Sequence, residues 1–446
     1  MRKHDYLALI FLLGVVFTIS CTSDEDLSSE VPDDVYSENL YLEFNRWIYA
    51  KMNHDYLWRH DLPDSLSCDY DLAPVSFFNS LLSPKDRFSY CDINNSYQPP
   101  KKDNSLGYEY QKYELSNGQE FSQVLLVTNP ELKKRGLKRG DVIICQVDNN
   151  IIVRGRLLQN RVVPTDTIEA SYPFFDQQTV YLDSIYYVNS HKVGYLCYLK
   201  FDDIADLVPS IERFYDTQID EMVLDLRYNP GGYVNTCKYL SNSIVNEKGY
   251  NGIFQQCTYN DILTADYEKS TGSGISVNRF SIPNNGHNVL GSPMYGLNLK
   301  RVFILTSKNS ASASEAAIIS LRPYMEVIII GEQTYGKGVG SWTIRDTKYK
   351  YQLQPITMRY HNALMETTPD DGIAVDYFIP DGYSTLKNEL GDVNEPLLAK
   401  ALDLISEGQT SNVYDQDVEG KTYNLKKKGL SSLFNANILQ EEQLYE

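Results

Sequence analysis

The chain has 446 residues, and 42% of them are hydrophobic. It is therefore long enough for two or three domains with a sizeable core, and its composition is that of a globular protein rather than a disordered one. Its 41 Lys and Arg residues are outnumbered by 59 Asp and Glu residues, which gives a net charge of −18. This balance argues against nucleic acid as a partner, because phosphate binding needs a basic surface.

The first twenty residues have the pattern of an export signal. A short basic start precedes an apolar run, Leu7–Ile19, which is too short to span a membrane comfortably. The run ends next to Cys21, and this resembles a bacterial lipoprotein signal, although Thr18 stands where that pattern usually has Leu. We therefore predict that residues 1–20 are a signal peptide and that Cys21 carries the lipid. The alternative is ordinary secretion without a lipid.

Residues 21–36 are polar and acidic, without periodicity, and are predicted to form a tether. The acidic stretch Ser23–Asp26 resembles the surface-export signals of some Gram-negative lipoproteins. The predicted location is therefore the cell envelope of a Gram-negative bacterium. The lipid would anchor the chain to a membrane, and the folded part would face the periplasm or the cell surface.

Six further cysteines are scattered along the chain without CxxC spacing. Two pairs can form disulfides in an oxidising compartment, and the sequence does not fix the pairing: Cys68 with Cys91, or Cys237 with Cys257. Two others lie in apolar runs typical of strands and are predicted core thiols: Cys145 and Cys197. The histidines are dispersed, and no His, Cys and Asp residues share metal-ligand spacing, so neither a metal site nor a cofactor is predicted.

A small helical subdomain is predicted over residues 37–100. The stretch Ser37–Tyr56 places its apolar side chains mainly on one face of a helix, and a second helix starts near Ala73. Residues 95–104 are rich in Asn, Pro and Lys and are predicted to be a linker. We expect this subdomain to pack on the main body.

A small β domain is predicted over residues 101–187. Two strand-like runs precede a short helix and the turn GLKRGDVI within Asn129–Asn149, and this order is similar to the PDZ domain signature. In that fold, backbone N–H groups receive a peptide C-terminus while the peptide adds as a strand to the sheet edge. The alternative is a β domain that binds nothing. The resemblance implies that the peptide-binding loop contains Leu106, Gly107 and Tyr108.

Residues 188–408 alternate buried strands with helices, which predicts an α/β core. Within it, residues 247–298 are rich in Gly, Asn, Ser and Tyr and are predicted to form a cap over the candidate active site of this core. Residues 409–446 are weakly patterned and are predicted to form a tail, in which Lys426–Lys428 is a solvated charge run. The predicted core strands are Tyr195–Leu199, Met222–Arg227, Arg301–Thr306 and Val327–Gly331.

The motif with the most specific chemistry is the pair Ser312 and Lys337. Ser312 is the middle serine of SASASE, and Lys337 follows 25 residues later in GEQTYGKGVG. The residues between them predict a helix and then a buried strand, so a serine at the start of the helix can meet a lysine just after the strand. A neutral lysine can take the proton of a serine hydroxyl, which is the Ser-Lys form of nucleophilic catalysis.

Acyl transfer also needs donors for the oxyanion. The N–H of Ala313 lies at the predicted helix start, where the N–H groups and the helix dipole favour negative charge. Gly231 and Gly232 follow a buried strand in the turn NPGG, where a substrate carbonyl can approach the backbone closely. These three residues are the predicted oxyanion donors.

Neighbouring polar residues have structural interpretations. Ser310 and Ser314 are expected to cap or pack rather than react. Glu315 is an acid in the first turn of the helix, which is favourable to the helix dipole. Arg227 is expected to pair with a carboxylate.

Together, the PDZ-like block, LRYNPGG, SASASE, GEQTYGKG and GIAVDYFIPD resemble the carboxyl-terminal processing peptidases, or tail-specific proteases, over about residues 40–405. The resemblance implies an α/β, crotonase-like (ClpP/crotonase-type) protease core with an inserted PDZ-like domain and a small N-terminal helical subdomain. It implies Ser312 as nucleophile and Lys337 as general base. The function implied is that of an exported serine endopeptidase, which cleaves polypeptides recruited through their C-terminal tails.

One position departs from the family pattern. A glutamine often stands four residues after the lysine and helps to hold it, whereas this chain has Ser341. Ser341 is the predicted lysine-orienting residue, either through its own hydrogen bond or through a bridging water molecule. The third alternative is that the lysine is held less well and the activity is reduced. This departure motivates an alternative function, a weakly active or inactive peptide-binding scaffold lipoprotein. A small-molecule esterase and a Ser-His dyad with His287 or His361 are further alternatives.

Overall fold

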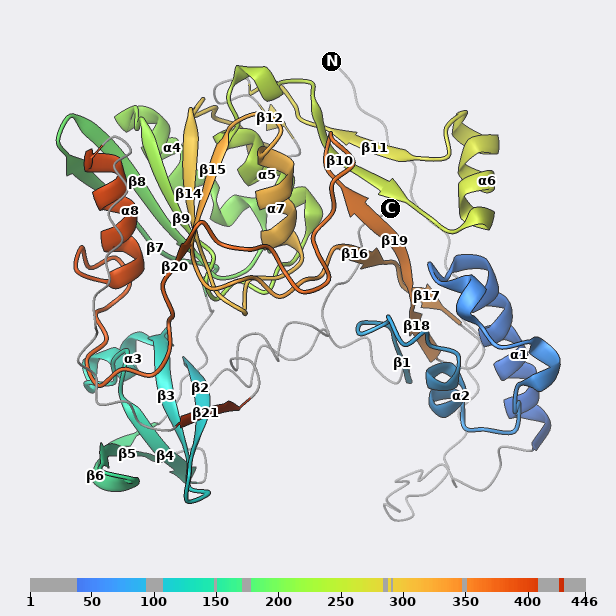
Figure 1. Ribbon diagram of the computed structural model, residues 1–446, viewed down its shortest axis with the longest axis horizontal. Coiled ribbons are helices and arrows are strands. Elements are labelled where there is room, and N and C mark those ends of the chain that lie inside the picture. Colours follow the sequence, from blue (N-terminus) through green and yellow to red (C-terminus); the bar gives the residue numbers. More distant parts are fainter. Residues whose placement is uncertain are drawn as a thin grey trace, which may run out of the picture.

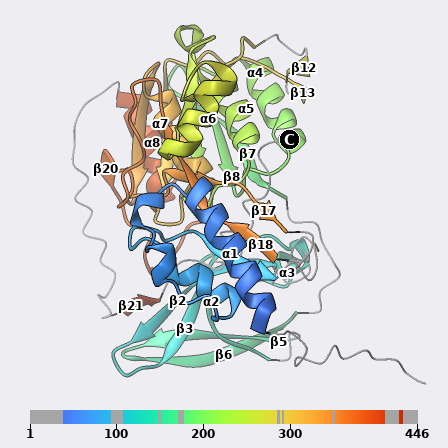
Figure 2. The ribbon, with the colours of Figure 1, turned by 90° about the vertical axis from the view of Figure 1, so that its right-hand side faces the viewer.

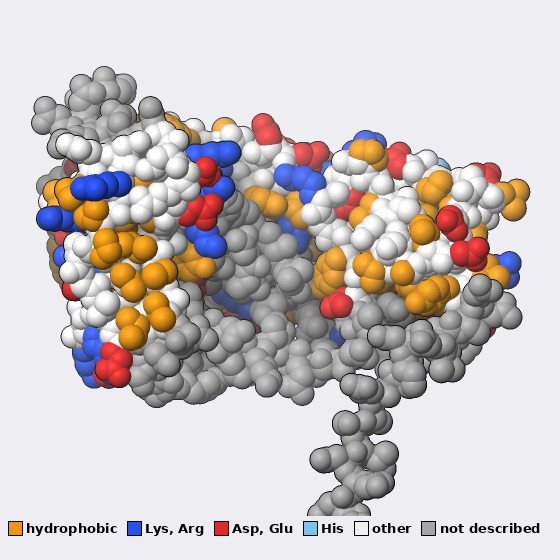
Figure 3. All heavy atoms as spheres, turned by 90° about the horizontal axis from the view of Figure 1, so that it is seen from below, with side chains coloured by type: hydrophobic (Ala, Val, Ile, Leu, Met, Phe, Trp, Pro, Cys, Tyr) orange, Lys and Arg blue, Asp and Glu red, His pale blue; other side chains and the backbone are white. Residues whose placement is uncertain are grey.

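The computed structural model describes residues 38–93, 107–147, 151–170, 178–283, 288–289, 292–346, 351–407 and 425–428. The predicted signal peptide, Cys21 and the tether lie outside this part of the chain, as do Leu106 and His287. Figure 1 shows a helical N-terminal part, a β domain and a larger α/β body. Seen from below, the described side chains of the β domain and of the N-terminal helices lie on opposite sides of the face (Figures 1 and 3).

The N-terminal part confirms the predicted helical pair. Phe44, Ile48 and Met52 recur every four residues, lie on one face of the first helix, and pack against Phe77 and Phe78 of the second. This part also contributes a strand that pairs with the body, at Tyr90↔Gln354. Its elements are α1 (Glu38–Asp55), the 3₁₀ turns Arg59–Asp61 and Ser65–Ser67, α2 (Pro74–Ser80) and β1 (Tyr90–Ile93).

The β domain is one sheet of six strands, in the order β21-β2-β3-β4-β5-β6. The short helix α3 (Pro130–Lys134) follows β3, as the sequence predicted. The sixth strand comes from the distant C-terminal tail, which sequence analysis assigned to solvent. The strands are β2 (Tyr108–Leu115), β3 (Glu120–Val127), β4 (Val142–Val147), β5 (Ile151–Leu158), β6 (Arg161–Glu169) and β21 (Leu425–Lys428).

The body is built on a second six-stranded sheet, in the order β20-β15-β14-β9-β8-β7. All but the last residue of strand β7 falls inside the region 101–187 that was predicted to be the β domain, but β7 pairs antiparallel with β8. The other neighbours in this sheet pair in parallel. The strands are β7 (Val180–Val188), β8 (His191–Tyr198), β9 (Glu221–Asp225), β14 (Arg301–Thr306), β15 (Glu326–Gly331) and β20 (Tyr377–Phe378).

Helices cover both faces of this sheet, because alternate residues of its strands are apolar on opposite sides. Leu224 and Ile304 pack against α4, α5 and α7, whereas their neighbours Val223 and Phe303 pack against α8. Figure 1 shows α8 on the opposite side of the sheet from α5 and α7. The helices are the 3₁₀ turn Ile204–Asp206, α4 (Val208–Thr217), α5 (Val234–Ile244), α7 (Ala313–Leu321) and α8 (Pro396–Glu407).

The region 247–298 is more than a cap. Its strand β10 pairs antiparallel with β19, and β19 pairs with β16 just after the predicted lysine (Figure 1). Its helix α6 lies beside α1, as the side view shows (Figure 2). The elements of this region are the 3₁₀ turn Glu247–Gly249, β10 (Ile253–Thr258), α6 (Asp261–Thr271), β11 (Ser276–Arg279), β12 (Asn288–Val289) and β13 (Ser292–Pro293). The strands that follow the predicted lysine are β16 (Val339–Ser341), β17 (Ile344–Arg345), β18 (Tyr351–Gln354) and β19 (Ile356–His361).

The six cysteines after Cys21 are free thiols, so neither predicted disulfide is formed in the structure. Cys197 is buried, as predicted, but Cys145 is exposed because its side chain lies on the outward face of β4. Among the residues that the structure describes, none of the helices combines the length and the apolar character that a membrane crossing needs.

Candidate active site

Ser312 lies between β14 and α7, at the N-cap of the helix. Its φ of 55° is in the left-handed region, which is rare for a residue with a side chain and marks stored strain. The preceding loop is held by Ser310, whose Oγ donates to Leu226 O at 2.8 Å. The predicted structural role of Ser310 is thus confirmed. A strained corner between a strand and a helix is a position from which a serine side chain can face a substrate.

A single buried carboxylate joins the Ser312 and Lys337 segments. Glu315 Oε2 accepts hydrogen bonds from Ser312 N at 2.9 Å and from Lys337 N at 2.8 Å. Its Oε1 accepts from Gly336 N at 2.7 Å and from Thr334 Oγ1 at 2.5 Å. The structure therefore brings the two predicted residues to one point, although 25 residues separate them.

Sequence analysis missed this role of Glu315. The spacing Ser-x-x-Glu is the signature of a capping box, and both halves of the box are present here. That signature could have tied Glu315 to the Ser312 backbone, but not to the Lys337 loop. Burial raises the pKa of the Glu315 carboxyl, and its four hydrogen-bond donors oppose that shift.

The NPGG turn lies directly against Ser312. A Cβ atom placed on Gly231 would lie 2.8 Å from Ser312 Cβ, and one on Gly232 would lie 2.1 Å from Phe201 O. Both glycines have positive φ values, 115° and 136°, so the turn depends on them. Gly231 N already donates to Asn229 Oδ1 at 2.9 Å. Among the predicted oxyanion donors, Gly232 and Ala313 are therefore better placed than Gly231.

Lys337 is buried, with 6% of its surface exposed, under a segment of the N-terminal subdomain. Its Nζ lies 5.3 Å from the centre of the Phe88 ring. Arg87 Nη2 donates to Gly336 O at 2.6 Å and to Asp370 O at 2.8 Å. The segment that follows α2 thus forms part of the wall around the lysine. No signal in the local sequence predicted this contribution.

Ser341 is connected to a glutamine from a neighbouring strand. Gln354 Nε2 donates to Ser341 Oγ at 2.9 Å, and Gln354 Oε1 accepts from Thr343 Oγ1 at 2.6 Å. Gln354 is buried at the end of β18. The chain therefore places a glutamine side chain beside the position that departs from the family pattern.

The predicted peptide-binding loop precedes β2. Gly107, with φ 75°, accepts hydrogen bonds at its carbonyl from Thr128 N and Asn129 N, each at 2.9 Å. A Cβ atom on Gly107 would lie 2.5 Å from Asn129 Cβ, so a larger residue does not fit. Tyr108 is buried as the first residue of β2.

A buried ionic network joins the β domain to the body. Arg139 of the β domain donates to Asp381 Oδ1 at 2.9 Å and to Tyr228 OH at 2.5 Å, and Tyr228 OH donates to Asp381. Lys387 Nζ also contacts Asp381. Burial alone would raise the pKa of Asp381, but Arg139 and Lys387 hold it well below its usual range. Burial lowers the pKa of Lys387 to about 8, despite its partner.

The predicted pairing of Arg227 is confirmed. Its guanidinium binds Glu395 through two hydrogen bonds of 2.6 and 2.8 Å, and its Nε donates to Asp225 at 2.9 Å. Arg227 is fully buried and directly precedes the network residue Tyr228. The start of the NPGG turn is therefore anchored to the ionic network.

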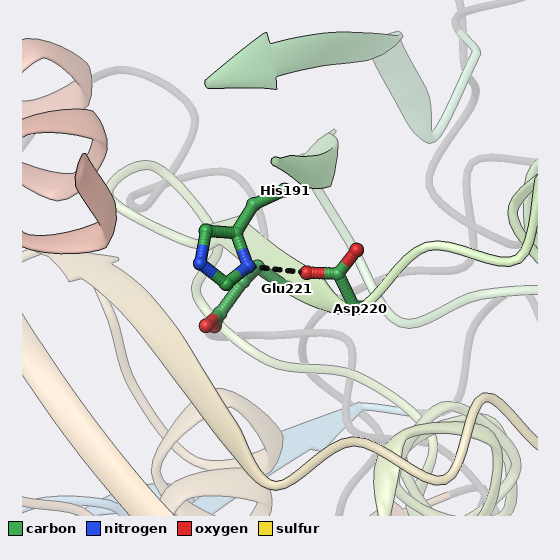
Figure 4. Close-up of side chains that lie close together, drawn as sticks. All are labelled: His191, Asp220 and Glu221. Atoms are coloured by element: carbon green, nitrogen blue, oxygen red, sulfur yellow. Dashed lines mark hydrogen bonds and ion pairs between the residues drawn. The ribbon is translucent and has the colours of Figure 1, made fainter. Parts of the chain in front are cut away.

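Three potential metal ligands lie together at the opposite end of the core sheet: His191, Asp220 and Glu221 (Figure 4). His191 Nδ1 lies 2.5 Å from Asp220 Oδ1, and the Glu221 carboxylate points away from Asp220. Arg301 makes three hydrogen bonds of 2.8–3.0 Å to Glu221. Because ion pairs account for all three side chains, this group has no assigned role in the site.

The alternative dyad with His361 has no structural support. Its Nε2 is hydrogen-bonded to Thr258 Oγ1 at 2.9 Å, and its Nδ1 lies 3.3 Å from Met365 O. Both ring nitrogens are thus engaged, one by Thr258 of β10 and the other by the segment that follows β19. Burial lowers the pKa of this histidine.

The chain resembles proteins of a known family. The sequence pattern of Peptidase family S41 matches residues 192–378, and that of the Peptidase S41 N-terminal domain matches residues 43–90. The chain is 22% identical over 382 residues to a probable CtpA-like serine protease of Staphylococcus haemolyticus, covering 79% of this chain and 69% of that one. A similar protein of Staphylococcus epidermidis is 24% identical over 360 residues, covering 77% and 66%.

A solved structure supports the same assignment. A putative S41 protease from Bacteroides fragilis is 25% identical, with a TM-score of 0.66, and covers 82% of this chain and 98% of that one. These matches and the mixed α/β fold define the chain as a serine peptidase. It belongs to peptidase family S41, the C-terminal processing proteases, as the sequence motifs implied.

Proposed function

We propose that the chain is an exported endopeptidase that cleaves polypeptides through a Ser-Lys acyl-enzyme, on a crotonase-like core. The observation that carries the proposal is the Glu315 carboxylate, which binds the backbone N–H groups of both Ser312 and Lys337. A buried lysine and a strained serine held at one carboxylate are the parts that Ser-Lys chemistry needs.

In the proposed reaction, Ser312 Oγ attacks the scissile carbonyl carbon and its proton passes to the neutral amine of Lys337. The C–N bond then breaks, and Lys337 returns that proton to the leaving amine. Water next attacks the acyl ester, with Lys337 accepting its proton, and Ser312 Oγ–H is restored. The cycle needs no metal or cofactor, since every proton that Lys337 accepts is returned.

The N–H groups of Ala313 and Gly232 are the proposed oxyanion donors. Ala313 N belongs to the first turn of α7, where helix geometry leaves N–H groups without an intrahelical acceptor. The close approach between Gly231 and Ser312 Cβ brings the glycine turn to the same corner. Loss of one such donor typically costs about 10²–10³ in rate.

The β domain is the proposed PDZ-like module that recruits substrate tails. Gly107 directly precedes β2 and Tyr108 is its first residue, which is where such a module receives a peptide C-terminus. The proposed setting is the cell envelope, with the chain held at the membrane by a lipid on Cys21. Polypeptides are the proposed partners.

The test is cleavage of casein by residues 22–446, as wild type, Ser312→Ala and Lys337→Ala. We expect both variants to lose activity by at least about 10³, the residual catalysis coming from binding and the oxyanion donors. Ser320→Ala is the matched control, because Ser320 lies later in α7 and donates to Ala316 O within the helix. Cleavage by Ser312→Ala at the wild-type rate would rule out the proposal.

The scaffold alternative makes a different prediction. An inactive scaffold would show no cleavage in any variant and no labelling of Ser312 by a fluorophosphonate probe. Labelling of the wild type but not of Ser312→Ala, together with casein cleavage, would exclude it. Cleavage of small esters but not of casein would favour the esterase alternative.

A further inference from the structure

The tail strand β21 lies on the edge of the β domain that the proposed peptide would use. It pairs antiparallel with β2, from Leu115↔Leu425 to Lys112↔Lys428. The other edge of β2 pairs with β3, so the tail covers the remaining edge. Figures 1 and 2 show β21 beside β2, at a distance from α8, the preceding described element.

The last residue of this strand is held by side chains of the sheet. Lys428 Nζ lies 2.5 Å from Glu114 Oε2 and 3.2 Å from Glu120 Oε1. Gln111 Nε2 donates to Lys428 O at 2.9 Å. The edge therefore selects a basic side chain at this register, which an antiparallel ladder alone would not do.

The neighbouring lysine faces the opposite way, because successive side chains in a strand alternate. Lys427 lines a small pocket together with Tyr228, Asp381 and Glu332. Glu332 Oε2 is buried there and has no hydrogen-bond partner in the described part of the chain. Glu332 directly follows β15 and precedes Lys337 by five residues. The tail thus spans the docking edge and the start of the lysine loop.

The direction of the strand fits a docked peptide. Because the pairing is antiparallel, the tail runs from the end of β2 at Leu115 toward its start at Tyr108. A peptide whose C-terminus reached the loop at Gly107 would run the same way. In a chain with a net charge of −18, three consecutive lysines supply charge that matches the acidic edge.

From this we infer that Leu425–Lys428 is a built-in ligand of the β2 edge. It occupies the place where a substrate tail docks. Substrate tails that displace it carry two consecutive lysines, at the positions that Lys427 and Lys428 occupy in the ladder. This inference rests on the proposed function of the β domain. A tethered strand acts at an effective concentration of about millimolar, so a free peptide must compete with it.

A binding experiment tests this without catalysis. Residues 22–446 carrying Ser312→Ala are titrated with a fluorescein-labelled peptide YNLKKKG, the sequence of residues 423–429. In the parent chain the tail competes, and we expect weak binding. Adding Lys428→Glu removes both ion pairs of the tail, and we expect the peptide to bind at least about tenfold more tightly. Equal affinity for both chains, or no binding to either, would overturn the inference.

The matched control is Lys269→Glu, which makes the same charge change at an exposed lysine of α6, outside the β domain. We expect it to leave peptide affinity within about twofold. A peptide with glutamate at the position of Lys428 should bind Lys428→Glu weakly. Should it bind as tightly as YNLKKKG, the edge would not select lysine and the inference would fail.

Hydrogen exchange of the β2 amides provides a second readout. Exchange over residues 108–115 should be faster in Lys428→Glu than in the parent, and saturating peptide should restore protection. Unchanged exchange would contradict displacement of the tail. Because neither readout depends on catalysis, a failure here would not bear on the result of the casein test. Conversely, absent casein cleavage in the wild type would reject the proposed peptidase and not the tail contact.

Discussion

Two buried carboxylates beside the candidate active site are stabilised in opposite ways. Glu315 binds three backbone N–H groups and one hydroxyl, all of them neutral. Asp381 instead binds Arg139, Lys387 and the phenol of Tyr228. Burial acts on both, yet the pKa of Glu315 is raised and that of Asp381 is lowered. The neutral donors of Glu315 fix the backbone geometry around Ser312 and Lys337. The charged partners of Asp381 instead hold the β domain to the body.

The largest effect on stability is expected at the charged network. Asp381→Ala leaves Arg139 and Lys387 buried without their shared carboxylate, and such losses cost about 3–5 kcal/mol. Urea unfolding of the wild type and the variant measures this difference. Asp216→Ala, at an exposed aspartate of α4, should change the free energy of unfolding by less than about 0.5 kcal/mol. A loss at Asp381 no larger than this control would show that the network does not stabilise the junction.

The next largest effect is expected at Glu315, where a substitution can keep the size of the side chain and remove its charge. Glu315→Gln keeps the size of the side chain but replaces one acceptor oxygen by an NH₂ group, which faces N–H donors that it cannot satisfy. We expect a loss of about 1–3 kcal/mol in stability. We also expect casein cleavage to fall by about 10² or more, because the Ser312 and Lys337 backbones lose their common anchor. Glu268→Gln on α6 is the control, and full activity in Glu315→Gln would contradict the anchoring role.

The pH dependence of stability should differ in sign between the two carboxylates. Asp381 has a lowered pKa in the folded state, so its contribution is present above about pH 4 and is lost as the pH falls further. Glu315 has a raised pKa, so its contribution is full below about pH 4 and declines as the pH rises through the folded-state value. The stability gap between wild type and Glu315→Gln should therefore narrow with rising pH, by about 1.4 kcal/mol for each unit of raised pKa.

Urea unfolding at a series of pH values between 3 and 7 tests both signs with the same variants. In Asp381→Ala, the gap to the wild type should shrink toward low pH instead. Parallel curves for the wild type and both variants would contradict the comparison, since they would mean that neither carboxylate titrates differently in the folded and unfolded chains.

Local patterns predicted most of the elements but not their remote partners. Arg301–Thr306 forms a strand with the predicted limits, and Ser312 starts a helix, because apolar runs and a helix cap are local signals. The pairing of Lys426–Lys428 with β2 was missed, since three lysines resemble a solvated run and the partner lies more than 300 residues away. Cys145 was wrongly assigned to the core, because an apolar run does not show whether both faces of a strand are covered.

The residues of the candidate site also fall into two groups, those that local motifs predicted and those that reach the site through remote contacts. Ser312, Lys337 and the glycine turn were found from motifs, and the structure gathers them at one corner. The contribution of Arg87 and Phe88 was not found, because their hydrogen bonds and ring contact join segments about 250 residues apart. Such contacts depend on how the N-terminal subdomain packs, which no local pattern encodes.

The smallest predicted effect tests that contribution. Arg87→Ala removes two hydrogen bonds from the carbonyls of Gly336 and Asp370, and a partly exposed pair of this kind contributes about 1 kcal/mol. If the bonds position the lysine loop for reaction, kcat should fall about fivefold while KM stays within twofold. Arg87→Lys should not rescue kcat fully, because an ammonium lacks the planar fork. Lys85→Ala, two residues earlier and exposed, should retain the wild-type kcat. An unchanged kcat in Arg87→Ala would mean that the N-terminal subdomain covers the lysine loop without positioning it.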